Sequence, residues 1–218
     1  MKKYDTVIFD MDGTLLNTID DLADSVNYML QKYSFPTKTV AQVCSYVGNG
    51  IKLLIERAIP DGADNPKFEE AFECFRAHYE IHCEDKTGPY DGVCDLVKKF
   101  KECGYKLAIV SNKFDAGLKI LANKFFPEVE VVVGERESEG VKKKPAPDMV
   151  YIAMDQLGST KEGSVYIGDS DVDFLTAKNS GIDCVSVLWG FRDKEFLEGF
   201  GASVFAETPD EVFNIVNG

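Results

Sequence analysis

Aspartates with short spacing recur at two places in this 218-residue sequence. The run from Asp10 to Thr14 reads Asp-Met-Asp-Gly-Thr, and the run from Gly168 to Asp173 reads Gly-Asp-Ser-Asp-Val-Asp. Carboxylates that gather in one crevice repel each other strongly unless a cation lies among them, and oxygen ligands favour a hard cation such as Mg²⁺. The two runs therefore predict a shared metal site.

Other motifs with similar spacing fit less well. An EF-hand calcium loop needs glycine at position six and glutamate at position twelve, but a loop that starts at Asp10 has Leu15 and Asp21 there, and a loop from Asp169 fails at both positions too. Neither the P-loop pattern nor the G-x-G-x-x-G pattern occurs. For Asp10 and Asp12 taken alone, an ordinary Asp-Gly turn remains an alternative.

Short apolar segments precede the polar runs. Residues 4–9 predict a buried strand that ends at Asp10, and Ser111 with Asn112 follow a second predicted strand. Further along the chain, predicted strands alternate with predicted helices. The strands are 106–110, 129–133, 164–167 and 184–188, and the helices are 92–102, 116–124, 148–157, 174–180 and 210–216. This alternation predicts an α/β fold with a doubly wound parallel sheet, whose active site lies at the carboxyl ends of the strands.

The segment between the first strand and residue 85 has a different pattern. Apolar residues recur there at helical spacing, as in Leu22, Val26, Met29 and Leu30, and no strand is evident over about 70 residues. We therefore expect residues 17–85 to form a separate helical domain, inserted into a core made of residues 1–16 and 86–218.

The amino-acid composition argues against two classes of binding partner, nucleic acids and membranes. The chain has 24 Lys and Arg against 37 Asp and Glu, a net charge of −13, which argues against nucleic-acid binding. No segment approaches the ~18 apolar residues of a membrane span, and the N-terminus does not resemble a signal peptide. We expect a cytoplasmic protein without a membrane partner, whose six cysteines stay reduced. The sequence does not indicate an oligomeric state.

Four motifs, in order, resemble those of haloacid dehalogenase (HAD) superfamily phosphatases, and within them the phosphoglycolate phosphatase subfamily. They are the Asp10 to Thr14 run, Ser111 with Asn112, Lys144 in Lys-Pro-Ala-Pro-Asp, and the Gly168 to Asp173 run. The resemblance spans nearly the whole chain. It implies a Rossmann-like core with a helical cap of the C1 type.

The resemblance also implies roles. Asp10 becomes the nucleophile that carries an aspartyl-phosphate, and Asp12 the general acid and then base. Mg²⁺ is expected on the Asp10 carboxylate, the Asp12 carbonyl and Asp169, with Asp173 in a second shell. The catalytic and phosphate-binding set is completed by Ser111, Asn112, Lys144, Gly13 and Thr14, of which the first three clamp the transferring phosphoryl oxygens.

The cap residues Gly48, Asn49 and Gly50 resemble the same subfamily. Glycines at a helix start expose backbone N–H groups, which suit a small anion such as the carboxylate of 2-phosphoglycolate. A flexible helix start with no ligand is the alternative. We expect a small phosphorylated metabolite as substrate, 2-phosphoglycolate first.

Several alternatives stay open. Members of the family with the same cap type hydrolyse pyrophosphate, sugar phosphates or nucleoside monophosphates, and β-phosphoglucomutases return the phosphoryl group to a sugar. A non-catalytic metal-binding regulatory domain is an alternative of another class, although every motif residue that the chemistry needs is present. Outside the motifs, we expect His78 and His82 to lie on an ordinary helix face, Asp171 to be a helix N-terminal carboxylate, and residues 189–192 to serve packing.

Overall fold

The computed structural model describes residues 3–218, and its contacts divide the chain into two compact units. One unit contains the chain up to Leu16 together with Pro89–Gly218, and the other contains Asn17–Gly88. The pattern of the sequence predicts the second boundary after Asp85, whereas the contacts place it after Gly88. Two short strands, β2 (Leu16–Asn17) and β3 (Gly88–Pro89), pair with each other at the points where the chain passes from one unit to the other.

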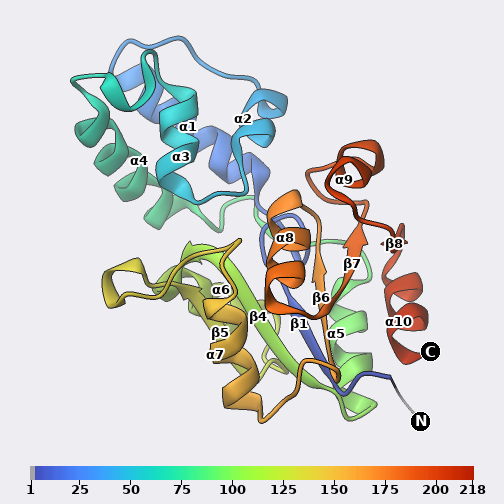
Figure 1. The fold of residues 1–218 in the computed structure, drawn as a ribbon. Helices are drawn as coiled ribbons and strands as arrows, with labels where there is room; N and C mark the ends of the chain where they lie inside the picture. The colour runs from blue at the N-terminus through green and yellow to red at the C-terminus, as the bar shows by residue number, and fades with distance from the viewer. Residues whose placement is uncertain (1–2) are drawn as a thin grey trace. The chain divides into compact units, whose positions relative to one another are not determined.

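The first unit is built on a six-stranded sheet with the order β5-β4-β1-β6-β7-β8, in which every pair is parallel (Figure 1). The strands are β1 (Thr6–Phe9), β4 (Lys106–Phe114), β5 (Val131–Glu135), β6 (Ser164–Gly168), β7 (Asp183–Val187) and β8 (Phe205–Ala206). The chain crosses to one side of β1 and then to the other. This confirms the predicted doubly wound sheet.

Helices cover both faces of this sheet. They are α5 (Val93–Glu102), α6 (Asp115–Phe125), α7 (Asp148–Leu157), α8 (Asp171–Ser180), α9 (Lys194–Phe200) and α10 (Pro209–Asn217), with a 3₁₀ turn at Glu137–Glu139. Alternate strand residues enter different cores: Val7 and Phe9 pack in a cluster with α5, α6 and α10, whereas Ile8 packs in another with α7 and α8. Strands buried on both faces explain the continuous apolar runs in the sequence.

The register of the central strands brings their polar ends to one place. Phe9 of β1 is opposite Ile109 of β4 and Ile167 of β6, so the residues that follow lie level with one another at the carboxyl edge. Asp10 and Asp169 therefore come together from segments far apart in the sequence.

Several elements differ from the sequence prediction, and β5 lies at Val131–Glu135 and not at 129–133. Strand β4 continues to Phe114, so Ser111 and Asn112 lie inside it and not after it. Helix α8 begins at Asp171, because Ser170 caps it in a reciprocal capping box with Asp173. Helix α9 and strand β8 were not predicted, since both are short.

The second unit is helical. Its helices are α1 (Ile19–Lys32), α2 (Val40–Tyr46), α3 (Ile51–Ala58) and α4 (Phe68–His82), with a 3₁₀ turn at Gly62–Asp64. Their apolar faces share one core cluster that includes Val26, Ile55 and Phe75. Helix α2 was not predicted, because Val43 is its only buried residue and no apolar face repeats. Within residues 3–218, no helix combines the length and the apolar character that a membrane crossing requires. In the described part of the chain, none of the six cysteines forms a disulfide.

Candidate active site

Three carboxylates meet at the carboxyl edge of the sheet. Asp10 follows β1, Asp169 follows β6, and Asp173 comes from the first turn of α8, and one oxygen of each lies within 4.8 Å of the others. Asp169 and Asp173 are completely buried and Asp10 nearly so. We call these three residues the acidic triad. A buried concentration of negative charge is costly unless cations neutralise it.

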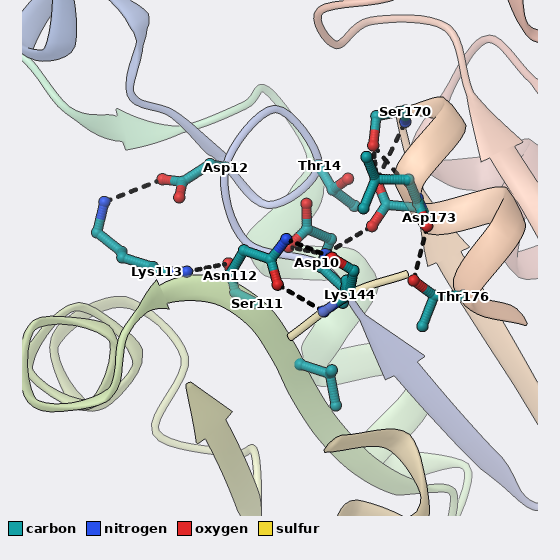
Figure 2. Close-up of polar contacts among 12 residues, drawn as sticks. Asp10, Asp12, Thr14, Ser111, Asn112, Lys113, Lys144, Ser170, Asp173 and Thr176 are labelled. Atoms are coloured by element: carbon teal, nitrogen blue, oxygen red, sulfur yellow. Dashed lines mark hydrogen bonds and ion pairs between the residues drawn. The ribbon is translucent and has the colours of Figure 1, made fainter. Parts of the chain in front are cut away.

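Lys144 supplies one positive charge to the acidic triad. Its Nζ lies 2.8 Å from Asp10 Oδ1 and 2.6 Å from Asp173 Oδ1 (Figure 2). It also donates to the Tyr166 hydroxyl at 3.2 Å. Burial lowers the pKa of Lys144, but the attraction of Asp10 and Asp173 outweighs burial and holds that pKa well above its usual value. Lys144 is therefore a permanent cation in the site.

One lysine does not balance three carboxylates. Burial, followed by repulsion from Asp173, raises the pKa of Asp10 to about 7 despite the ion pair with Lys144. Burial, Asp173 and Asp10 also raise the pKa of Asp169 well above its usual value. Asp10 Oδ1 is buried and accepts no well-directed hydrogen bond from the residues described. An all-oxygen donor set whose negative charge exceeds that of its one lysine partner fits a hard divalent cation.

Glycines bring the backbone against these carboxylates. A Cβ on Gly13 would lie 2.4 Å from Asp169 Oδ2, and one on Gly190 would lie 2.3 Å from Asp169 Cβ and 2.4 Å from the Gly13 carbonyl. Asp169 is also held by hydrogen bonds, since the Phe191 N–H donates to Oδ2 at 2.7 Å and the Thr14 hydroxyl donates to Oδ1 at 3.0 Å. Asp169 therefore has one fixed position, as a metal ligand requires.

Asp173 is held in a similar way. The Ser170 hydroxyl donates to Asp173 Oδ2 at 2.6 Å, and a Cβ on Gly168 would lie 2.3 Å from Asp173 Cβ. The family resemblance implies a second-shell place for Asp173, whereas its carboxylate lies beside those of Asp10 and Asp169 and pairs with Lys144.

Asp12 lies apart from the acidic triad. Its carboxylate turns toward Lys113, whose Nζ is 3.1 Å from Asp12 Oδ1, while Lys144 lies on the side of Asp10 (Figure 2). The two aspartates of this motif thus have different surroundings: Asp10 is buried among charges, and the side chain of Asp12 is 18% exposed. Unlike environments allow two carboxylates to take different roles.

Ser111 and Asn112 approach the site from β4. The Asn112 carboxamide accepts from the Lys144 N–H at 2.8 Å and donates to the Lys144 carbonyl at 3.1 Å. Asn112 therefore holds the segment that carries Lys144, a role that the sequence did not indicate. The Ser111 hydroxyl accepts from the Lys113 N–H at 3.3 Å.

The remaining residues singled out from the sequence lie elsewhere. Gly48, Asn49 and Gly50 belong to the second unit, in the turn before α3, where both glycines have positive φ. Asp171 is the first residue of α8 and lies 3.7 Å from the Arg192 guanidinium.

Sequence reasoning missed three groups of the site. Residues 189–192 were expected to serve packing only, yet Gly190 and Phe191 fix a carboxylate of the acidic triad. Tyr166 looks like an ordinary strand residue, but its hydroxyl donates to the Val110 carbonyl at 2.9 Å and accepts from Lys144. The position of Lys113 could have been predicted from the sequence. This lysine directly follows the motif residues Ser111 and Asn112 after an apolar strand, and this places it at the same edge of the sheet.

Comparison with known proteins agrees with this geometry. Residues 7–187 match the family model described as haloacid dehalogenase-like hydrolase. The chain belongs to this family. It is 32% identical over 220 residues to a phosphoglycolate phosphatase of Colwellia psychrerythraea, covering 97% of this chain and 96% of the relative. It is 30% identical over 220 residues to the pyrophosphatase PpaX of Halalkalibacterium halodurans, covering 98% and 97%.

A solved structure extends the similarity to the full length. A protein from Lactobacillus delbrueckii subsp. bulgaricus, which carries a provisional phosphoglycolate phosphatase name, superposes with a TM-score of 0.95 at 34% identity and complete coverage of both chains. The family resemblance and the predicted fold class are therefore confirmed. The chain is a phosphatase of the haloacid dehalogenase-like hydrolases.

Proposed function

We propose that this protein is a Mg²⁺-dependent phosphomonoester hydrolase that acts on 2-phosphoglycolate through an aspartyl-phosphate on Asp10. The observation that carries the proposal is the acidic triad with Lys144 at the carboxyl ends of β1 and β6. The oxygens of Asp10, Asp169 and Asp173, with the Asp12 carbonyl, are the groups that would hold the metal. When bound, Mg²⁺ neutralises charge on the phosphoryl oxygens and favours the ionised form of Asp10.

The chain's own residues divide the chemistry. An oxygen of Asp10 attacks phosphorus, a bond to phosphorus forms there, and the bond to the leaving alkoxide breaks. Asp12, whose carboxylate points away from the triad, gives a proton to that alkoxide and later takes one from the water that hydrolyses the acyl phosphate. Phosphate is released and Asp10 is restored.

Positioned donors stabilise the transferring group. Lys144 lies 2.8 Å from the nucleophilic carboxylate, so the same ammonium can follow the phosphoryl oxygens through the transition state. Ser111 adds a hydroxyl from β4, with Gly13 and Thr14 from the loop after β1. Asn112 acts through Lys144, because its carboxamide binds both the N–H and the carbonyl of the Lys144 backbone.

We assign the selection of the substrate to the helical cap, and the names of two relatives support 2-phosphoglycolate or pyrophosphate as that substrate. The turn of Gly48, Asn49 and Gly50 precedes α3, where no side chain caps the helix, and helix N-terminal amides suit a carboxylate. A phosphoglycolate phosphatase name is carried by a relative that matches 97% of the chain. Pyrophosphate is the second candidate, since a relative matched over 98% of the chain is named a pyrophosphatase.

A rate panel tests the proposal. With Mg²⁺ present, kcat/KM for 2-phosphoglycolate should exceed that for glucose phosphates by at least ~10-fold, which corresponds to about 1.4 kcal/mol. Removal of divalent ions with EDTA should abolish turnover. Ca²⁺ should not replace Mg²⁺, because it prefers more ligands at longer distances.

The outcomes separate the parts of the proposal. A preference for pyrophosphate or hexose phosphates would overturn the phosphoglycolate assignment and leave the phosphatase standing. Equal rates with Ca²⁺ and Mg²⁺, or full activity in EDTA, would overturn the metal assignment.

A further inference from the structure

Two lysines reach the carboxyl edge of the sheet, and they have different partners. The Lys144 ammonium lies inside the acidic triad, between Asp10 and Asp173. The Lys113 ammonium lies beside Asp12, away from the triad, with its side chain only 8% exposed (Figure 2). The proposed mechanism uses Lys144 and gives Lys113 no part.

The position of Lys113 is set by the sheet. Because β4 continues through residue 114, Lys113 belongs to a strand and not to a loop, and its N–H donates to the Ser111 hydroxyl at 3.3 Å. A long side chain that is nearly buried at a charged site has lost much of its rotamer freedom, so a specific contact must compensate. Asp12 supplies one such contact.

The neighbourhood of Asp12 is the leaving-group side of the reaction. A general acid must come within about 3 Å of the oxygen that it protonates. The Lys113 Nζ is 3.1 Å from Asp12 Oδ1, so the ammonium lies beside the carboxyl group that protonates the leaving oxygen. An ammonium carries three N–H donors, which allows one lysine to contact Asp12 and a substrate anion together.

The two substrates considered above share one property. Glycolate, which leaves from 2-phosphoglycolate, carries a carboxylate close to the reacting oxygen, and the group that leaves from pyrophosphate is phosphate. Both leaving groups are anions, and the protein that must accept them has a net charge of −13. A cation beside the leaving group would offset this repulsion locally.

We propose that Lys113 binds a negatively charged group on the part of the substrate that leaves, such as the carboxylate of glycolate or the oxygens of phosphate. Lys113 thereby selects phosphoric esters and anhydrides whose leaving part carries such a group. The inference rests on the proposed function, because it uses Asp12 as the group next to the leaving oxygen. It assigns Lys113 as a specificity-determining residue of the core, separate from the specificity assigned to the cap.

A charge series of small substrates tests this assignment. The series is 2-phosphoglycolate, ethyl phosphate and 2-aminoethyl phosphate, whose leaving groups are similar in size and carry a negative, a zero and a positive charge. Pyrophosphate is measured beside them as a second anionic case. The variants are Lys113→Met, which removes the charge, and Lys113→Arg, which keeps it. Lys106→Met is the matched control, since Lys106 starts the same strand and donates to the Gly158 carbonyl outside the site.

Lys113→Met should lower kcat/KM for 2-phosphoglycolate and for pyrophosphate by at least ~10-fold, the loss of one charge-assisted hydrogen bond, and change the value for ethyl phosphate by less than ~3-fold. In the same variant, kcat/KM for 2-aminoethyl phosphate should come closer to kcat/KM for ethyl phosphate. Lys113→Arg should retain most of the preference for anions, and Lys106→Met should match the unmodified protein.

An equal loss on all substrates of the series would overturn the inference, because Lys113 would then act only by holding Asp12. Retention of the anion preference in Lys113→Met would also overturn it. A different result would contradict the proposed function, namely a preference of the unmodified protein for hexose phosphates. In that case the ratio of pyrophosphate to ethyl phosphate still shows whether Lys113 responds to leaving-group charge.

Discussion

Each unit of the chain contains a cluster of titratable side chains, and the two clusters differ in how their charges are satisfied. In the core, the acidic triad and Lys144 are buried and bind one another. In the helical unit, His78 and His82 stack with ring centroids 4.3 Å apart beside a cavity of about 340 Å³ lined also by Asp24 and Asp85. We call these last four residues the histidine cluster.

The histidine cluster has local partners for its polar atoms. His82 Nδ1 lies 2.7 Å from Asp85, His78 Nδ1 lies 3.0 Å from the Ser25 hydroxyl, and Asp24 pairs with Lys86 at 2.6 Å. The side chains of Asp24, His82 and Asp85 are 57%, 43% and 59% exposed, and His78 is half-buried. Of the two clusters, the acidic triad is the one whose negative charge is buried and exceeds that of its lysine partner, Lys144. Function is expected where that imbalance exists.

The largest predicted effect comes from the acidic triad. Asp10→Asn should reduce turnover below detection, because it removes the nucleophile with almost no change in volume, and the uncatalysed hydrolysis of phosphate monoesters is among the slowest reactions known. The measurement is the steady-state rate with Mg²⁺ on the preferred substrate, together with circular dichroism to check the fold. Asp24→Asn makes the same chemical change in the histidine cluster and should keep normal activity. More than about a tenth of the rate in Asp10→Asn would contradict covalent catalysis by Asp10.

Much of the acidic triad and its sheet could be predicted from the sequence. Short apolar runs that end in aspartate identify β1 and β6, and parallel strands bring their carboxyl ends to one edge. The order of the four motifs then identifies the family. These features depend on local patterns, which a single sequence displays directly.

Other parts of the site depend on contacts between distant segments. The N–H of Phe191 meets Asp169 across 22 positions of sequence, and Asn112 meets Lys144 across 32. Nothing in the local composition marks such pairs. The length of β4 was also underestimated, because Ser111, Asn112 and Lys113 are polar although they continue a buried strand at the functional edge. Polar strand residues at such an edge are a local inconsistency that function explains.

The second prediction concerns the backbone that supports the acidic triad. In Gly190→Ala, the new Cβ would stand 2.3 Å from Asp169 Cβ and 2.4 Å from the Gly13 carbonyl, both of which would have to move. We expect Mg²⁺ affinity to fall by about 10-fold or more, as with other changes behind metal ligands. Isothermal calorimetry measures this without turnover. Gly199→Ala is the control, since a Cβ there meets nothing within 4 Å. Equal Mg²⁺ affinity in the two variants would contradict the supporting role.

The third prediction tests the cap turn. Asn49→Trp should lower kcat/KM for 2-phosphoglycolate by about 5-fold more than for p-nitrophenyl phosphate, whose good leaving group needs less help from the cap. Glu69→Trp, on the exposed side of α4, should affect both substrates equally. A parallel loss on both substrates in Asn49→Trp would show that the turn acts on folding and not on substrate choice.

The smallest effect is expected from the histidine cluster. Burial lowers the pKa of His78, and repulsion from His82 lowers it further, while Asp24 and Asp85 partly oppose this. The Tyr28 ring stacks on His78 at 4.1 Å and the Ser25 hydroxyl faces its Nδ1. Because the folded protein resists protonation of His78, the unfolded chain binds more protons below pH ~6.5, and the stability from neutral His78 is lost as pH falls from there.

His78→Gln removes this titration. The fall in melting temperature between pH 7.5 and pH 5.5 should therefore become smaller by about 1–2 °C, a modest amount because His78 is only partly shielded from water. His82→Gln should recover only part of that change, since it removes the repulsion and leaves the burial. Both variants should keep kcat/KM within about 2-fold at pH 7.5, as expected for groups outside the machinery. A loss of turnover as large as that of Gly190→Ala would give the histidine cluster a part in catalysis and remove the contrast between the two units.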